Sequence, residues 1–253
     1  MLFRIDREPI KRILRRLHLI HPIRYTYRKL SLSIRRDSAQ SVEFYRPFVH
    51  QGSLCFDLGA HLGDKTEIFL KLGGRVIAVE PNPMCLETLR WRYGKNSKVT
   101  IVPKAISDQP GTATLHFGRS AAMASLREDW SDGKREAPPV EVTIDTIDAL
   151  IEQFGVPDFI KIDVEGLETK VIGGLSRSIP CICFEYFHRE LDNARNCLDR
   201  LASLGRIECN ATTMDWMHWI YPDWCDGPTL VERLAAKSDL VGGDIFVRFL
   251  PDA

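Results

Sequence analysis

The chain of 253 residues lacks several features that mark particular classes of protein. It has no run of 18 apolar residues, so no transmembrane helix is expected, and its first residues lack the continuous apolar segment of a secretory signal. Its seven cysteines form no C-x-x-C pair. This odd, scattered set indicates reduced thiols, and we therefore expect a cytoplasmic protein. Internal repeats and low-complexity tracts are also absent.

Charge is balanced over the whole chain but unevenly distributed. Lys and Arg number 34, as do Asp and Glu, yet residues 1–40 hold 11 basic residues and only three acidic ones. This asymmetry predicts a basic, helical N-terminal arm, residues 1–37, attached to a mildly acidic domain, residues 38–253. Two interpretations of the arm remain open. It either binds a membrane surface or a polyanionic glycan peripherally or, as we favour, packs on the domain with its arginines in solvent.

Residues 54–83, LCFDLGAHLGDKTEIFLKLGGRVIAVEPNP, are the most informative stretch. Their pattern predicts a buried strand ending in Asp57, a turn at Gly59 and Gly63, a helix, and a second strand ending in Glu80. Gly59 lets the backbone turn sharply and come close to a ligand. Glu80 lies where an acid accepts hydrogen bonds from ribose hydroxyls. The stretch is therefore typical of a nucleoside-binding unit.

The glycine pattern distinguishes between nucleosides. A dinucleotide site favours G-x-G-x-x-G, in which a helix N-terminus faces a pyrophosphate, whereas here Asp57 replaces the first glycine to give D-x-G-x-x-x-G. A carboxylate would repel a pyrophosphate but attract the ammonium and sulfonium groups of S-adenosylmethionine. We therefore expect S-adenosylmethionine. The alternative is an ordinary strand–turn–helix that binds nothing.

Strands and helices alternate along the rest of the chain, which predicts an α/β fold with a mostly parallel sheet and helices on both faces. A loop near the ligand end is expected over 118–139, and an aromatic-rich insertion over 215–237. The further predicted strands cover 99–102, 111–117, 158–164, 180–186, 206–209 and 244–249, and the further predicted helices cover 38–48, 84–93, 144–154, 168–175 and 190–204.

Acidic residues end two of the later strands, at Asp163 and Glu185. Ligands of open α/β sheets bind outside the carboxyl ends of the strands. If the two strands are neighbours, both carboxylates face one crevice, where burial and mutual repulsion suit acid–base work. They could equally hold a divalent cation with Glu165 or Glu168. The structural alternative places those two glutamates in the first turn of a helix, where acids complement the dipole.

Other side chains leave two interpretations open. His61, in the glycine turn, and His188, after the strand that carries Glu185, could each act as a base or be structural. Lys161 shares a strand face with Asp163 and is interpreted as the partner of a carboxylate. An aromatic group forms either a wall for a sugar-like acceptor or ordinary packing: Trp216, Trp219, Tyr221 and Trp224.

Together these segments resemble the FkbM family of S-adenosylmethionine-dependent methyltransferases. The resemblance rests on five runs in the family's order over roughly residues 40–250: DLGAHLGDKTEIF, VIAVEPNP, KAISDQPGTATL, PDFIKIDVEGLETKVIGGL and FEY. It implies a Rossmann-like class I methyltransferase fold with a seven-stranded sheet whose last strand is antiparallel. It also implies O-methylation of a hydroxyl on a sugar, a glycan or another secondary metabolite.

The resemblance implies a role for individual positions. The cofactor loop would comprise Asp57, Gly59, Ala60, His61 and Gly63; Glu80 would bind the ribose beside Pro81 and Asn82; Lys104, Ala105 and Ile106 would lie along the adenine. Asp163 and Glu165 would face the methyl-transfer centre. We expect Asp163, assisted by Glu185 or His188, to take the proton of the acceptor hydroxyl. His61 stands where the family often has asparagine.

Three other functions are alternatives to methyl transfer. The main alternative is a catalytically inactive cofactor-binding or scaffold module in a glycan-assembly complex, although the intact acidic run at 163–168 speaks against degeneration. A nicotinamide oxidoreductase is disfavoured by Asp57. Nucleic acid is not expected as a partner, because the domain outside the arm is acidic and carries no recognition motif.

Overall fold

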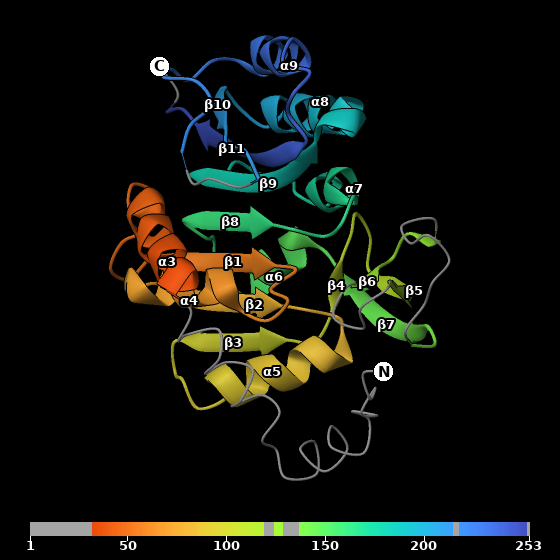
Figure 1. Cartoon of the computed structure of the whole chain (residues 1–253). Coiled ribbons are helices and arrows are strands. Elements are labelled where there is room, and N and C mark those ends of the chain that lie inside the picture. Colours follow the sequence, from red (N-terminus) through yellow and green to blue (C-terminus); the bar gives the residue numbers. More distant parts are fainter. Residues whose placement is uncertain (1–31, 119–123, 129–136, 215–217, 252–253) are drawn as a thin grey trace, which may run out of the picture.

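The computed structural model describes residues 32–118, 124–128, 137–214 and 218–251. Its main sheet has seven strands: β1 (Leu54–Leu58), β2 (Arg75–Val79), β3 (Val99–Val102), β8 (Phe159–Ile162), β9 (Cys181–Phe187), β10 (Ile207–Ala211) and β11 (Gly242–Phe249). They lie in the order β10–β11–β9–β8–β1–β2–β3 (Figure 1). Strand β11 runs antiparallel to the other six strands of this sheet. This confirms the predicted Rossmann-like fold with an antiparallel last strand.

Helices cover both faces of the sheet, because its strands are apolar on both sides. On one face, Tyr45, Phe69 and Leu89 pack against buried strand residues such as Phe246, so α3 (Leu32–Tyr45), α4 (Asp64–Lys71) and α5 (Pro83–Tyr93) lie there. The opposite core cluster includes residues of α6 (Ile147–Phe154), α7 (Glu168–Gly173), α8 (Leu191–Ala202) and α9 (Gly227–Ala235). A short 3-10 helix, η2 (His188–Glu190), joins β9 to α8.

A second, four-stranded sheet comprises β4 (Ala105–Ile106), β5 (Gly111–Phe117), β6 (Ala124–Ser125) and β7 (Val140–Asp145), in the order β4–β7–β5–β6. Figure 1 shows it beyond the carboxyl ends of β1 and β2. Leu115, Phe117 and Val142 form its own small core. The small sheet therefore closes one side of the region in which ligands of such folds bind.

Two predicted helices differ from the structure. The helix expected over 144–154 is wrong at its start: β7 continues to Asp145, and α6 begins at Ile147 after Thr146, whose Oγ1 accepts a hydrogen bond from the Ala149 amide. The helix expected over 38–48 is α3, which begins at Leu32 and so runs across residue 37. Residues 1–31 lie outside the described residues, and the predicted arm and its boundary stay predictions.

The aromatic insertion packs on the core. Trp219 lies 4.8 Å from Phe44 and 5.1 Å from Phe246 between ring centroids, and 5.2 Å from Trp224. These contacts favour the packing interpretation for Trp219 and Trp224, while Trp216 lies outside the described residues. No helix in the described ranges is both long and apolar enough to cross a membrane.

Candidate active site

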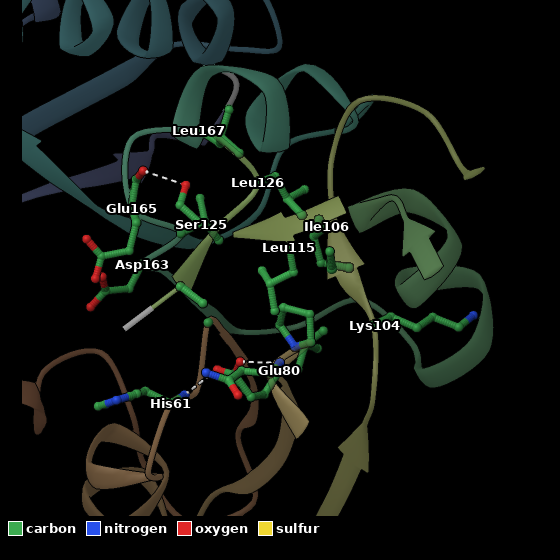
Figure 2. A pocket seen from close by; sticks show the side chains of 17 residues that line it. His61, Glu80, Lys104, Ile106, Leu115, Ser125, Leu126, Asp163, Glu165 and Leu167 are labelled. Atoms are coloured by element: carbon green, nitrogen blue, oxygen red, sulfur yellow. Dashed lines mark hydrogen bonds between the residues drawn. The ribbon is translucent and has the colours of Figure 1, made fainter. Parts of the chain in front are cut away.

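A cleft opens at the carboxyl ends of β1, β2 and β8, with about 820 Å³ of space that includes its open mouth (Figure 2). Its walls come from the glycine turn, the residues after β2, the small sheet and the segment after β8. Eight of the eleven residues predicted to bind the cofactor line it: Gly59, His61, Glu80, Pro81, Asn82, Lys104, Ala105 and Ile106. Of the three predicted catalytic residues, only Asp163 does so.

Glu80 is held at the floor of the cleft by backbone amides. Its Oε2 accepts a hydrogen bond from the His61 amide at 2.7 Å, and its Oε1 accepts one from the Asn82 amide at 2.8 Å. Burial raises the pKa of Glu80 to about 7, although both amide hydrogen bonds act to lower it. Each oxygen has a second lone pair, so the fixed carboxylate can still accept hydroxyl donors.

The glycine turn brings the end of β1 against the residue that follows β8. Gly59 has φ 82°, and a Cβ there would lie 1.8 Å from the carbonyl oxygen of Asp163, so only glycine fits. His61 also has a positive φ, 50°, a conformation in which Asn, Asp and His are enriched among non-glycine residues. This backbone conformation therefore suits histidine at position 61, as it would suit asparagine.

Three predicted cofactor residues do not line the cleft: Asp57, Ala60 and Gly63. Asp57 is buried and accepts a hydrogen bond of 2.5 Å from the Thr66 hydroxyl on α4. Burial raises its pKa to about 6, against the lowering effect of that hydrogen bond. The expectation that Asp57 faces the cationic end of the cofactor is thus not reproduced, because the side chain turns toward α4 instead.

The end of the glycine turn is fixed by α5. Gly63 caps α4 with φ 82°, and its carbonyl accepts a hydrogen bond of 2.8 Å from the Tyr93 hydroxyl. A guanidinium nitrogen of Arg92 donates to the carbonyl oxygen of Leu62. Gly63 therefore serves helix packing rather than the wall of the cleft, and these contacts hold the turn in place before any ligand binds.

Asp163 and Glu165 form the acidic end of the cleft (Figure 2). The Asp163 side chain is 38% exposed, while its backbone amide donates to the carbonyl of Leu58 and so ties it to β1. Strands β8 and β9 are neighbours, with Ile162 paired to Phe184, so the condition stated for the two carboxylates is met. The residues that follow this pair are Asp163 and Glu185, which therefore lie side by side at the end of the sheet.

Glu185 lies behind this wall rather than on it. It borders a smaller neighbouring cavity of about 240 Å³, and its Oε2 is buried without a hydrogen-bond partner. Burial, followed by the negative charge of Asp163, raises the pKa of Glu185 to about 8. Glu185 is therefore mostly protonated at neutral pH.

His188 is directed away from the cleft. Its Nε2 lies 3.1 Å from the backbone oxygen of Leu234 near the end of α9, and its amide donates to the carbonyl of Val241. These contacts join η2 to the C-terminal segment. The structure thus gives His188 a place in packing and does not support the predicted assistance to Asp163.

Glu168 stabilises the turn that precedes α7. Its Oε1 accepts hydrogen bonds from the amides of Val164 and Gly166, at 3.3 and 3.2 Å, in a turn where Glu165 and Gly166 both have positive φ. This geometry agrees with the structural alternative for Glu168. Across the described parts of the chain, no group of three His, Cys, Asp or Glu side chains is arranged to hold a metal ion.

The sequence did not predict four wall residues, which belong to the small sheet or directly follow its strand β6: Leu115, Ala124, Ser125 and Leu126. The Ser125 hydroxyl donates to the carbonyl of Glu165 at 3.3 Å, which joins the small sheet to the acidic end. Only Leu115 had a usable signal, the alternation of apolar residues in β5. Lys104 contributes to the wall, but Figure 2 shows its side chain directed outward, where its Nζ pairs with Asp145 at 2.6 Å.

The raised pKa values predict that stability falls as pH rises. The folded protein binds protons at Asp57, Glu80 and Glu185 more tightly than the unfolded chain does, up to about pH 6, 7 and 8 respectively. The free energy of unfolding should therefore decrease between about pH 4.5 and 8, by as much as about 1.4 kcal/mol per pH unit for each fully shifted proton. Urea denaturation across this range measures the slope.

Replacing Glu185 with glutamine supplies the control for this slope. The variant cannot ionise at position 185, so its stability should fall less steeply between pH 7 and 8 than that of the wild type. A stability that rises with pH across the whole range, in both proteins, would contradict the placement of these carboxyl groups in the folded state.

Three solved structures to which this chain is similar are distant from it in sequence. Precorrin-6y C5,15-methyltransferase from Geobacter metallireducens is 13% identical, with a TM-score of 0.46 and coverage of 84% of this chain and 87% of that chain. Fibrillarin from Aeropyrum pernix is 11% identical, with a TM-score of 0.46 and coverage of 79% and 68%. A SAM-dependent O-methyltransferase from Thermotoga maritima is 14% identical, with a TM-score of 0.42 and coverage of 86% and 66%. No curated protein sequence gives a match.

A family model gives a more specific result. The model of the methyltransferase FkbM domain matches residues 57–206, which is more than half of the chain. The matched region contains the glycine turn, Glu80 and the acidic run after β8. The chain therefore belongs to the FkbM family of methyltransferases, whose cofactor is S-adenosylmethionine.

Proposed function

We propose that this methyltransferase acts on a hydroxyl oxygen of a sugar, a glycan or another small secondary metabolite. The proposal rests on two carboxyl groups, Glu80 and Asp163, that line one cleft but differ in burial. Glu80 is fixed by backbone amides and suits a ribose, whereas Asp163 is partly exposed and suits removal of a proton from an alcohol.

The residues of the cleft fit S-adenosylmethionine. Both oxygens of Glu80 can accept ribose hydroxyls beyond the amides that they already bind. Ile106 and Leu115 offer an apolar wall for an adenine ring. When bound, the cofactor supplies an electrophilic methyl group on a sulfonium.

Asp163 is the proposed general base. An alcohol is a weak nucleophile until it is partly deprotonated, and a positioned carboxylate that accepts its proton accelerates such reactions by about 10²–10⁴-fold. Glu185 holds its own proton at neutral pH, because burial and the nearby Asp163 charge raise its pKa to about 8. Glu185 thus adds no negative charge beside Asp163 at neutral pH.

Transfer of an isotopic label to a panel of acceptors tests this function. The protein is incubated with S-adenosylmethionine carrying a ¹³C-labelled methyl group and with glycosides, oligosaccharides and polyketide alcohols, beside matched amines and RNA. We expect ¹³C NMR to find the label as a methyl ether on a hydroxylated acceptor. Label on nitrogen, on carbon or on RNA would contradict the proposal, and cofactor binding without transfer to any acceptor would favour the inactive module.

A further inference from the structure

Lys161 is a buried cation at the centre of the sheet. Its side chain is 1% exposed, although it stands only two residues before Asp163. Its Nζ lies 3.1 Å from Oδ1 of Asp244 and 3.6 Å from Oδ2 of Asp163, and it donates a hydrogen bond of 2.9 Å to the carbonyl of Ile162. Because a lone buried ammonium is unfavourable, these contacts are what allow it to remain charged.

The strand register explains how this cluster forms. Lys161 pairs with Cys183 across β8 and β9, and Asp244 pairs with Glu185 across β11 and β9. Residues two positions apart on a strand lie on the same face of a sheet. Asp163, Glu185 and Asp244 therefore form one row of carboxyl groups on three adjacent strands, with the ammonium of Lys161 against it.

The contacts of Lys161 reach Asp163 from two directions. The carbonyl of Ile162 belongs to the peptide bond that leads into Asp163, so the hydrogen bond from Nζ fixes the backbone there. The ion pair at 3.6 Å holds the side-chain carboxyl group of Asp163. Asp244 lies on the opposite side of the ammonium and holds it between the two carboxylates.

We propose that Lys161 is a positioning residue of the active site: anchored by Asp244, its ammonium holds Asp163 toward the cleft and balances the charge of the carboxyl row that Asp163 shares with Glu185 and Asp244. This inference rests on the proposed role of Asp163 as the base. It assigns a function to two residues that do not touch the cleft and that lie on strands far apart in the sequence.

Titration of Glu185 tests the proposed effect of the Lys161 charge on the carboxyl row, and it needs no methyl acceptor. The charged or titratable groups that interact electrostatically with Glu185 are Asp163, Lys161, Glu165 and Asp244. Three further groups interact electrostatically with members of this cluster: Asp57, Lys65 and Cys183. Protein labelled with ¹³C at the glutamate carboxyl carbon is titrated by NMR, and Glu185→Gln identifies the signal. Lys161→Met should raise the midpoint by about one pH unit or more, and Asp244→Asn should lower it, because a cation and an anion act in opposite directions.

Two further measurements separate positioning from a merely structural role. Lys161→Arg retains the charge, so its midpoint should stay near that of the wild type. With an acceptor from the panel above, Lys161→Met should lower kcat at least about tenfold while KM for S-adenosylmethionine stays unchanged, and Lys161→Arg should recover part of this loss. If Lys161→Met fails to fold because it removes a buried charge, the midpoint of Glu185 is measured in Asp244→Asn, which retains Lys161.

An unchanged Glu185 midpoint in Lys161→Met, or a midpoint that moves upward in Asp244→Asn, would overturn the proposal. So would the expected shifts with an unchanged kcat. Failure of the proposed function is recognised separately: Asp163→Asn would then retain full turnover whatever the titration of Glu185 shows.

Discussion

Replacing Asp163 with asparagine is expected to reduce methyl transfer by about 10²–10⁴-fold, because the amide cannot accept the proton of the acceptor hydroxyl. Cofactor affinity should stay nearly unchanged, because the substitution preserves the size of the side chain. The hydrogen bonds that fix Glu80 come from the amides of His61 and Asn82 and do not involve Asp163. The side chain is 38% exposed, so core packing is little affected. Initial rates with an identified acceptor, together with calorimetric titration of S-adenosylmethionine, measure the two effects.

Glu152→Gln provides a matched control for this variant. Glu152 is an exposed carboxylate on α6, and its replacement removes one negative charge at a site away from the cleft. Its turnover should equal that of the wild type. If Asp163→Asn is as active as Glu152→Gln, Asp163 is not the base.

Glu80→Ala is expected to weaken S-adenosylmethionine binding by about 1–3 kcal/mol, which is roughly 5–150-fold in Kd. The variant loses the acceptor proposed for the ribose hydroxyls. It also leaves the amides of His61 and Asn82 without the oxygens that they bind, which loosens the turn on both sides. Calorimetric titration at pH 8, where the wild-type carboxylate is ionised, measures the loss.

Glu80→Gln separates the contribution of the negative charge of Glu80 to cofactor affinity from the contribution of its shape. In the wild type, the pKa of Glu80 near 7 means that affinity should rise about tenfold between pH 6 and 8, if the ribose hydroxyls donate to the ionised form. The glutamine variant should lack this dependence. A Kd that is the same in the wild type and in Glu80→Ala would refute the ribose role.

The nucleoside-binding unit could be predicted because its determinants are local. Gly59 and Glu80 stand at the ends of two strands that are consecutive in the sequence and paired in the sheet, and each has a strong residue preference: a backbone that excludes Cβ at one position and an acid after an apolar strand at the other. The neighbouring strands β8 and β9 likewise brought Asp163 and Glu185 together as expected.

The remaining features depend on side-chain directions and on pairings between distant strands. Asp57 has the expected position, but its carboxylate binds Thr66 rather than facing the cleft. His188 follows the expected strand, yet its ring turns toward Leu234. Asp244 meets Lys161 only because the last strand inserts between β9 and β10. Sequence spacing contains no information about any of these three contacts.

The cleft above Glu80 is expected to bind S-adenosylmethionine and not a dinucleotide. Calorimetric titration of the purified protein, residues 1–253, with S-adenosylmethionine, S-adenosylhomocysteine and NAD measures this selectivity. We predict binding of the first two at one site and no binding of NAD. Binding of NAD alone, or of none of the three, would contradict the assignment of this cleft to S-adenosylmethionine.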